Sequence, residues 1–419
     1  MKIAVVGGGS TYTPELVDGF ARLLPGLGEL ALVDPARDRL DVVGPFAARI
    51  FNRYGHAGRV TWTDDLDTGL TDASIVILQL RVGGQRARIS DETFPLDVGC
   101  VGQETTGAGG LAKALRTVPV VREIADRAAR LAAPDAWIIN FANPVGIVTR
   151  ALLDAGQRAV GLCNVAIGFQ RRFAGLLGVV PDAVTLDHVG LNHLTWEQAA
   201  YVDGVDRLPD LLARHLPELA GEVRLPTEIL STLDSVPSYY LRYFYCHDEV
   251  VREERGQPTR GEQVAGIEAT LLRMYADPTL DTKPELLGQR GGAFYSEAAV
   301  GLLGALLDND DSGRIHSANV RNNGYLPFLP DEAVIEVSCR VDRDGPVPVP
   351  GRAVRPTQAG LIAHVSGYEQ LALDASVHGG RSRVYQAMLA HPLIGQHELA
   401  DALTDKLLAA NAGYLAWAR

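Results

Sequence analysis

The stretch KIAVVGGGSTYTPELVDGF, residues 2–20, gives the strongest indication of the fold in this sequence. Its apolar and β-branched residues at 3–6 are typical of a buried strand. Three glycines follow, and Thr13 can then cap a helix that has Pro14 at its first position. A strand, a glycine loop and a helix in this order form the first half of a dinucleotide-binding unit.

The glycine loop departs from the dinucleotide motif G-x-G-x-x-G at one position. Gly7 and Gly9 occupy its first two glycine positions, where they allow a tight turn and a close approach of the backbone to a pyrophosphate. Tyr12 stands at the third, so we expect the helix to pack less closely on the strand. Ser10 and Thr11 offer hydroxyl and N–H donors at the helix N-terminus, where phosphate binds favourably. A simple glycine-rich turn is the alternative interpretation.

The second predicted strand covers residues 29–34 and ends at an acidic residue. A carboxylate at this point of the fold binds the ribose hydroxyls of NAD, and its charge repels the 2′-phosphate of NADP. The sequence therefore predicts NAD as the cofactor, held by Gly7, Gly9, Ser10, Thr11 and Asp34.

The later N-terminal strands are almost continuously apolar, as in a parallel sheet that helices cover on both faces. They are predicted at 73–80, 136–144 and 159–164, with a long helix at 111–131. This pattern predicts an α/β fold with a doubly wound parallel sheet of the Rossmann type, similar to lactate and malate dehydrogenases. We expect residues 1–165 to form this NAD-binding domain.

The pattern changes in the second half of the chain. Alternating apolar and polar residues at 184–204 predict antiparallel strands, and a further strand is predicted at 334–341. Helical patterns occur at 237–255, 260–276, 293–308 and 356–374. We therefore expect residues 166–419 to form an α+β domain that packs on the sheet.

The composition excludes several classes of partner. A formal net charge of −12 argues against binding to nucleic acid or to an anionic membrane. The four cysteines form no CxxC pair, which is typical of reduced thiols rather than of a disulfide framework. The N-terminus lacks the features of a signal peptide, and no apolar run is long enough to span a bilayer. We expect a cytoplasmic protein.

Several stretches, in order over nearly the whole chain, resemble glycoside hydrolase family 4 and within it the 6-phospho-β-glucosidases. These stretches are GGGSTYTPEL (7–16), RVGGQRARISDE (81–92), GQETTGAGGLAKALRTVPV (102–120), NFANPVGIVT (140–149), GLCNVAIGF (161–169), GLNHLTW (190–196), SYYLRYF (238–244), QRGGAFYS (289–296) and NVRNNGYLPFLPDEAVIEV (319–337). Their number and order make the resemblance far more specific than the glycine loop alone. The family is an NAD-dependent exception to glycoside hydrolysis by two carboxylates.

The resemblance implies a reaction in which redox is transient. NAD⁺ takes a hydride from C3 of the sugar, and the resulting ketone acidifies the proton on C2. A base removes that proton while a divalent metal holds the developing enediolate, and the aglycone leaves from C1. Water then adds to the unsaturated sugar, and NADH returns the hydride. The implied net reaction is the hydrolysis of a 6-phospho-β-glucoside.

The resemblance also implies a metal site. Cys163 and His193 match the two protein ligands of the family, which generally uses Mn²⁺. Two protein ligands leave open positions for sugar hydroxyls, as a Lewis acid requires. A thiolate and an imidazole would by their softness also suit Zn²⁺, Co²⁺ or Ni²⁺. Without the resemblance, a packed core thiol and a hydrogen-bonded histidine are the simpler interpretations.

The resemblance implies roles in catalysis for three further positions. Tyr240 matches the tyrosine base of the family, and Tyr243 is the alternative. Either phenol would need a nearby cation to ionise at neutral pH. Glu104 matches a carboxylate of the site that raises the basicity of this tyrosine; an ordinary charge near a helix N-terminus is the alternative. Asn164 stands where α-specific members have an acidic aspartate, which indicates the β-specific type; it could equally cap the following helix.

A phosphorylated glycoside requires charge-assisted donors, which arginine supplies as a planar fork. The positions that match the substrate contacts of the family are Arg88, Asn143, Asn164 and Arg290, with Arg260 as a weaker candidate. One departure is Ala166, where the family often has proline. We expect a homodimer or homotetramer. A different family 4 substrate, a malate-type dehydrogenase of 2-hydroxy acids and a non-enzymatic NAD sensor are the alternatives.

Overall fold

The computed structural model describes residues 1–291, 294–307 and 315–418. Within these ranges thirteen strands form one sheet, in the order β10-β8-β7-β12-β11-β6-β5-β4-β1-β2-β3, with β13 paired to β12 and β9 paired to β8. The strands are β1 (Lys2–Val6), β2 (Glu29–Val33), β3 (Arg59–Thr63), β4 (Ile75–Leu78), β5 (Trp137–Asn140), β6 (Ala159–Gly161), β7 (Thr185–Leu191), β8 (Leu194–Val202), β9 (Val205–Asp206), β10 (Val236–Pro237), β11 (Ile315–Arg321), β12 (Val334–Asp342) and β13 (Gly345–Pro348).

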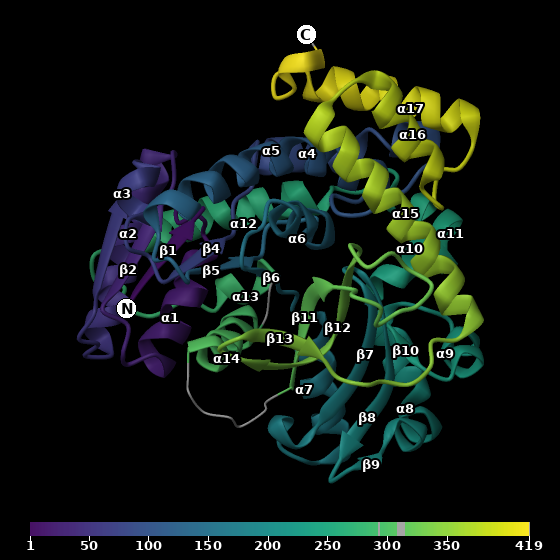
Figure 1. The fold of residues 1–419 in the computed structure, drawn as a ribbon, viewed down its shortest axis with the longest axis horizontal. Coiled ribbons are helices and arrows are strands. Elements are labelled where there is room, and N and C mark those ends of the chain that lie inside the picture. The colour runs from purple at the N-terminus through teal and green to yellow at the C-terminus, as the bar shows by residue number, and fades with distance from the viewer. Residues whose placement is uncertain (292–293, 308–314, 419) are drawn as a thin grey trace.

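The sheet has a parallel part and an antiparallel part (Figure 1). Strands β6, β5, β4, β1, β2 and β3 pair in parallel, and their residues are largely buried, as the continuous apolar runs predict. The N-terminal parallel sheet of the Rossmann type is thus confirmed. Strand β3 was not among the predicted strands, because its alternating sequence RVTWT is half exposed at the edge of the sheet.

Helices flank this sheet. They are α1 (Thr13–Leu23), α2 (Arg37–Arg53), α3 (Leu66–Leu70), α4 (Gly84–Thr93), α5 (Gly107–Leu131), α6 (Val145–Asp154), α7 (Val165–Leu177), α8 (Leu208–Val223), α9 (Thr227–Leu233), α10 (Arg242–Tyr245), α11 (His247–Glu254), α12 (Arg260–Tyr275), α13 (Leu286–Gln289), α14 (Tyr295–Leu307), α15 (Pro356–His378), α16 (Arg381–Ala390) and α17 (His397–Asn411), with short 3-10 turns η1 (Leu96–Val98), η2 (Pro181–Ala183), η3 (Tyr239–Leu241) and η4 (Ala416–Ala418). Helix α1 packs on α2 and α14, while α5 packs on α4, α6 and α15. In the described ranges, no helix combines the length and apolar character that crossing a bilayer requires.

The first helix begins one residue earlier than predicted. Its N-cap is Tyr12, and Thr13 is the first helical residue, so the prediction of Thr13 as the cap was wrong. The Thr13 hydroxyl instead donates to the Gly8 carbonyl at 2.9 Å and ties the helix to the glycine loop. The third motif position therefore holds an aromatic residue at the start of the helix.

The second half extends the sheet instead of forming a separate layer on it. The predicted antiparallel strands are confirmed as β7 and β8, and the predicted strand at 334–341 as β12. Strand β11 joins them to the parallel part, because Asn319 pairs with Gly161 of β6. A division of the chain at residues 165 and 166 stays a prediction.

The helical predictions for the second half were confirmed at 260–276 and 356–374. The predicted helix at 293–308 corresponds to α14. Its predicted end residues, 293 and 308, lie outside the described residues, and so does residue 292, which with 293 belongs to the QRGGAFYS motif. The prediction of one helix over 237–255 was wrong. Val236 and Pro237 pair with β8 as an edge strand, and the chain then forms η3, α10 and α11. Proline lacks the N–H donor of a helix interior but is tolerated in an edge strand.

Candidate active site

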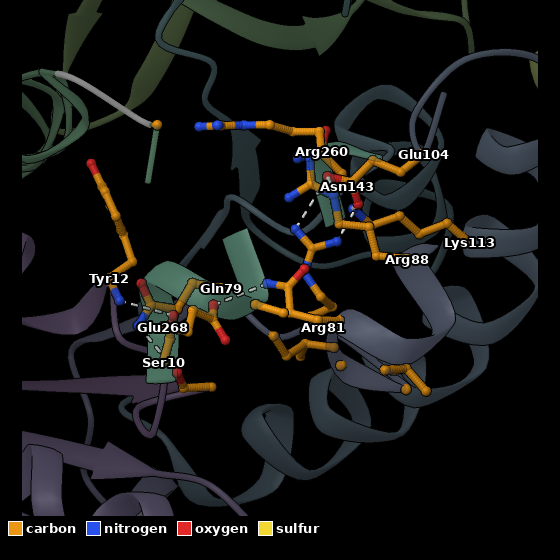
Figure 2. Close-up of a pocket in the computed structure, with 18 of the residues that line it drawn as sticks. Ser10, Tyr12, Gln79, Arg81, Arg88, Glu104, Lys113, Asn143, Arg260 and Glu268 are labelled. Atoms are coloured by element: carbon orange, nitrogen blue, oxygen red, sulfur yellow. Dashed lines mark hydrogen bonds and ion pairs between the residues drawn. The ribbon is translucent and has the colours of Figure 1, made fainter. Parts of the chain in front are cut away.

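A cavity of about 1690 Å³ lies at the carboxyl ends of β1, β2, β4 and β5, where ligands bind in sheets of this kind. Figure 2 shows two groups of side chains in it. Ser10, Tyr12 and Glu268 lie on one side, whereas a cluster of charged residues around Glu104 lies on the other. The cavity therefore offers a nucleotide-loop end and a charged end.

The glycine loop folds tightly against the ends of two strands. The N–H groups of Gly7 and Gly8 both donate to the Val33 carbonyl, at 2.8 and 2.9 Å. Gly7 has a φ of +94°, and a Cβ on it would lie 2.8 Å from the backbone of Leu80, so a side chain cannot fit. A Cβ on Gly8 would lie 2.7 Å from the Cβ of Leu32. The dinucleotide motif does not specify Gly8, although Gly8 is packed as tightly as Gly7.

Asp34 follows β2 and lines the cavity. One of its carboxylate oxygens accepts the N–H of Gly9 at 3.0 Å, and the other accepts the N–H of Ala36 at 2.9 Å. Arg39 also lines the cavity and donates to the Gly9 carbonyl at 2.9 Å. These bonds hold a carboxylate at the mouth of the loop, where the sequence predicts ribose recognition.

Arg290 lies at the nucleotide-loop end. Its guanidinium donates to the hydroxyl of Thr11 at 2.8 Å and to Glu268 at 2.9 Å, and it lies 5.5 Å from the centre of the Tyr12 ring. Burial opposes ionisation of Glu268, but the guanidinium groups of Arg290 and Arg39 hold the pKa of Glu268 below its ordinary value. The side chain of Thr11 is fully buried and serves Arg290, so its contribution to phosphate binding would come through its backbone.

The charged end centres on Glu104, which the sequence predicted. Its carboxylate accepts a hydrogen bond from Lys113 Nζ at 2.6 Å and forms ion pairs with Arg81 and with Arg88, whose Nε lies 3.2 Å away and donates to Glu92. Burial would raise the pKa of Glu104, but these three cations hold it well below its usual range. Burial and repulsion by Arg81 lower the pKa of Lys113 to about 7, although Glu104 opposes the shift. Arg81 and Lys113 lie in two of the family-like motifs and were not predicted as site residues.

Tyr240 lies between the charged end and the turn that joins β7 to β8. Its ring stacks on His193, with ring centres 3.7 Å apart and planes 9° from parallel. Burial, together with the charges of Cys163 and Glu104, raises the pKa of Tyr240 above its ordinary value, while Arg88 lowers it. Tyr243 also lines the cavity, but its ring centre lies 6.2 Å from that of Tyr240. The geometry thus joins Tyr240 directly to a predicted metal ligand.

His193 adopts a left-handed conformation, with a φ of +64°, in the two-residue turn after β7. This turn aims the imidazole inward, where it is buried. Its Nδ1 lies 2.9 Å from the hydroxyl of Thr105, so Nε2 is the nitrogen that can ligate a metal. The sequence motif predicted the residue, but the turn that orients it follows from the structure.

Cys163 lies between β6 and α7, at the helix N-terminus. Burial and the charge of Glu336 raise the pKa of its thiol, whereas the N–H groups of Asn164 and Val165 and the amide of Asn192 hydrogen-bond to it and lower the pKa. Burial outweighs these donors, so the pKa of the thiol lies above its ordinary value, and a bound cation would be needed to favour the thiolate that binds metal. In the described ranges no three side chains of the His, Cys, Asp or Glu type cluster together to hold a metal, and the pair of Cys163 and His193 stays a prediction.

The remaining predicted residues occupy different parts of the site. Arg88, Asn143 and Arg260 line the cavity. The Oδ1 atom of Asn143 is buried and has no hydrogen-bond partner in the described part of the chain, so it can accept a bond from a ligand hydroxyl. Asn164 is the N-cap of α7, yet its side chain makes no capping bond within the described residues.

The cavity therefore brings together most of the predicted residues. Those along its lining are Gly7, Ser10, Asp34, Arg88, Glu104, Asn143, Tyr240, Arg260 and Arg290. Five others lie outside the lining defined by the described residues: Gly9, Thr11, Cys163, Asn164 and His193. Tyr240, which contacts His193, connects the two groups.

The fold resembles that of malate dehydrogenases. A solved structure of the enzyme from Cryptosporidium parvum superposes with a TM-score of 0.54 at 14% identity, covering 90% of this chain and 98% of that one. At this identity the likeness concerns the fold alone. It confirms the predicted dehydrogenase-like sheet.

Similarity over the whole chain is much stronger elsewhere. A probable 6-phospho-beta-glucosidase of Bacillus subtilis is 36% identical, over 99% of this chain and 97% of its own length. A solved 6-phospho-beta glucosidase from Thermotoga maritima, with manganese, NAD⁺ and glucose-6-phosphate, has a TM-score of 0.92 at 33% identity and 99% coverage of both chains. The models of the family 4 glycosyl hydrolases and of their C-terminal domain match residues 2–179 and 188–394. The predicted resemblance is confirmed, and the chain belongs to glycosyl hydrolase family 4.

Proposed function

We propose that this chain hydrolyses 6-phospho-β-glucosides with the help of NAD and a divalent metal, with Mn²⁺ preferred. The observation that carries the proposal is the stacking of Tyr240 on His193, close to Cys163 and Glu104, beside a nucleotide loop. An ordinary dehydrogenase has no need of a thiol and a tyrosine at this place. The Bacillus subtilis relative and the solved Thermotoga maritima enzyme, which contains manganese, NAD⁺ and glucose-6-phosphate, support the same activity.

The nucleotide-loop end would hold the cofactor. The loop of Gly7 and Gly9 lets the pyrophosphate approach the start of α1, and Ser10 lines the cavity beside it. Asp34 accepts the ribose hydroxyls. When bound, NAD supplies the oxidation of the sugar at C3 and the later reduction. The residues of this end orient that cofactor toward the charged end.

Cys163 and His193 would hold the metal, which supplies a Lewis acid at the oxidised sugar. Beside such a cation Tyr240 would ionise, and its phenolate oxygen would take the proton from C2 and become the neutral phenol. Stacking on His193 fixes the ring plane of Tyr240, and Glu104 raises the proton affinity of the phenolate. Tyr243 has no such contact with His193 in the described residues and is the weaker candidate for the base.

The charged end suits a phosphorylated sugar. Arg88 at this end and Arg290 at the nucleotide-loop end are the proposed donors to the substrate, and Asn143 offers a buried oxygen that lacks a partner in the described residues. Arg260 lies on the same lining as a further donor. In the proposed β-specific reaction Asn164 contacts substrate without acting as an acid, because an amide cannot donate a proton at neutral pH. Departure of the aglycone then depends on the elimination alone.

The test is an assay of the purified chain with a chromogenic 6-phospho-β-glucoside, Mn²⁺ and a reductant. We expect many turnovers per NAD⁺ and no net rise in NADH absorbance. The 6-phospho-α-glucoside of the same chromogen is the control for anomer choice and should react more slowly. Consumption of one NAD⁺ per product would instead support a 2-hydroxy-acid dehydrogenase, which the comparisons do not favour. A cytoplasmic location and an assembly of two or four copies stay predictions.

A further inference from the structure

A buried network of charged side chains lies in the antiparallel part of the sheet, behind the proposed metal ligands. His188 of β7 stands between two carboxylates: its Nδ1 lies 2.7 Å from Glu197 of β8, and its Nε2 lies 3.0 Å from Glu336 of β12. The three side chains are at most 2% exposed. The mechanism above uses none of them.

The network places one imidazole between two buried acidic side chains. Burial would lower the pKa of His188, but Glu197 and Glu336 raise it to about 10, so the imidazole is a cation at neutral pH. In the described part of the chain, His188 is the one cationic group that forms an ion pair with either carboxylate. Burial and the charge of Glu336 raise the pKa of Glu197, although His188 opposes the rise. Two buried acidic groups that share one cation are costly unless a further cation lies nearby.

The network is connected to both proposed metal ligands through one amide. Asn192 donates from Nδ2 to Glu336 at 2.8 Å, and its side chain also hydrogen-bonds to Cys163. Asn192 directly precedes His193 in the turn between β7 and β8. Asn319 of β11 donates to the same oxygen of Glu336 at 2.9 Å and fixes it from the other side.

A contribution to the stability of the fold does not explain why this buried network is present. The second carboxylate oxygen of Glu197 is buried and has no hydrogen-bond partner in the described residues. A half-satisfied buried ion network is generally less stable than apolar residues of the same volume. Its position behind a proposed metal site offers a functional reason for placing two acidic side chains here.

We propose that Glu197, His188 and Glu336 form a positioning network for the metal site. Glu336 orients Asn192, and through it the Cys163 sulfur and the His193 turn, while the Glu336 carboxylate complements a divalent cation. This inference rests on the proposed function, because it takes Cys163 and His193 as the ligands. Partners behind metal ligands commonly contribute about 10- to 100-fold to metal affinity.

The experiment measures metal binding by the full chain without substrate or NAD. Mn²⁺ affinity is measured by calorimetry, and Co²⁺ is added as a spectroscopic probe whose thiolate charge-transfer band reports on Cys163. We expect Glu336→Gln to weaken Mn²⁺ binding about 10- to 100-fold and to shift the Co²⁺ band. Asp187→Asn is the matched control. This buried carboxylate, next to His188 in β7, accepts the backbone N–H of Arg352 and should leave metal binding unchanged.

A second variant keeps the inference testable if Glu336→Gln does not fold. Asn192→Ala removes the connecting amide at a half-buried turn, and it should also weaken Mn²⁺ binding and shift the band. Cys163→Ser should abolish the Co²⁺ band. If it does, and the folded variants keep both their Mn²⁺ affinity and the band, the inference is overturned while the proposed function stands. If the wild type shows no Co²⁺ band that depends on Cys163, then Cys163 and His193 are not the metal ligands, and the inference fails with them.

Discussion

The two ends of the active-site cavity are built in different ways. At the nucleotide-loop end, most of the bonds lie within the first β-α-β unit, as when the N–H of Gly9 donates to Asp34 at 3.0 Å, and Arg290 adds a bond to Thr11 from a distant segment. At the charged end, side chains from distant segments converge: Tyr240 stacks on His193, and Cys163 lies close enough to Tyr240 to raise its pKa. The first end is therefore determined largely by the geometry of one unit, whereas the second depends on long-range packing and buried charge.

This difference predicts different consequences of substitution. Loss of one side chain at the nucleotide-loop end removes a contact with a cofactor that several backbone groups still hold. Loss of one side chain at the charged end removes a ligand or a base that no neighbour replaces. The first change should appear mainly in cofactor affinity, and the second in the rate of the chemical step.

The largest effect should come from the proposed metal ligands. Cys163→Ser and His193→Ala should each abolish turnover, because each removes one of two protein ligands. Measured rates with and without added Mn²⁺ check this, and a chelator should reproduce the loss in the wild type. Cys100→Ser, another buried thiol, is the control and should stay active. Full activity of a metal-free sample would show that the charged end does not depend on metal.

The sequence predicted the nucleotide-loop end more completely than the charged end. Strand, glycines and Asp34 lie within one short segment, where local rules determine the geometry. For the charged end, family motifs indicated Glu104 and Tyr240. They did not reveal that Lys113 and Arg81 pair with Glu104, because Glu104 and Arg81 lie in loops whose paths the local sequence pattern does not determine. The helix predicted at 237–255 was wrong for a related reason: pairing of β10 with β8 outweighed its local helical pattern.

The next largest effect separates the two tyrosines. Tyr240→Phe should lower kcat by about 10²- to 10⁴-fold, the usual contribution of a general base. Tyr243→Phe should have a small effect, because Tyr240 and not Tyr243 stacks on His193. Substrate deuterated at C2 should react more slowly with the wild type. A normal rate for Tyr240→Phe with a large loss for Tyr243→Phe would move the base to Tyr243. A covalent carboxylate ester trapped with a 2-fluoro sugar would refute the elimination.

A smaller effect is expected at the cofactor end. Asp34→Ala should weaken NAD binding by about 1–3 kcal/mol, because the ribose loses its hydrogen bonds to a charged group. With saturating NAD, kcat should change little, since the residue is far from the reacting sugar atoms in this proposal. Asp34→Asn is the control that keeps hydrogen-bonding capacity at the position. A kcat as low as that of Tyr240→Phe would contradict the proposed separation between the two ends.

The smallest effect concerns pH and tests whether the charged end acts through its summed charge. Burial lowers the pKa of Lys113 to about 7, so the ammonium is charged below pH 7 and loses its proton above it. The unfolded chain keeps this proton to a higher pH, so the free energy of unfolding should rise between about pH 7 and pH 10 from this group.

Substrate binding should change in the opposite direction. A neutral Lys113 no longer balances Glu104, and the cavity becomes less favourable for a phosphate dianion. Because one charge at close range in a wet site contributes about 1 kcal/mol, KM for the phosphorylated substrate should rise about fivefold as pH increases through 7. The phosphate itself, with a second pKa of about 6, is already ionised there and cannot cause this rise. Lys113→Met should flatten the KM profile above pH 7. If the variant keeps the wild-type profile, another group titrates, and Lys113 does not set the charge that the substrate meets.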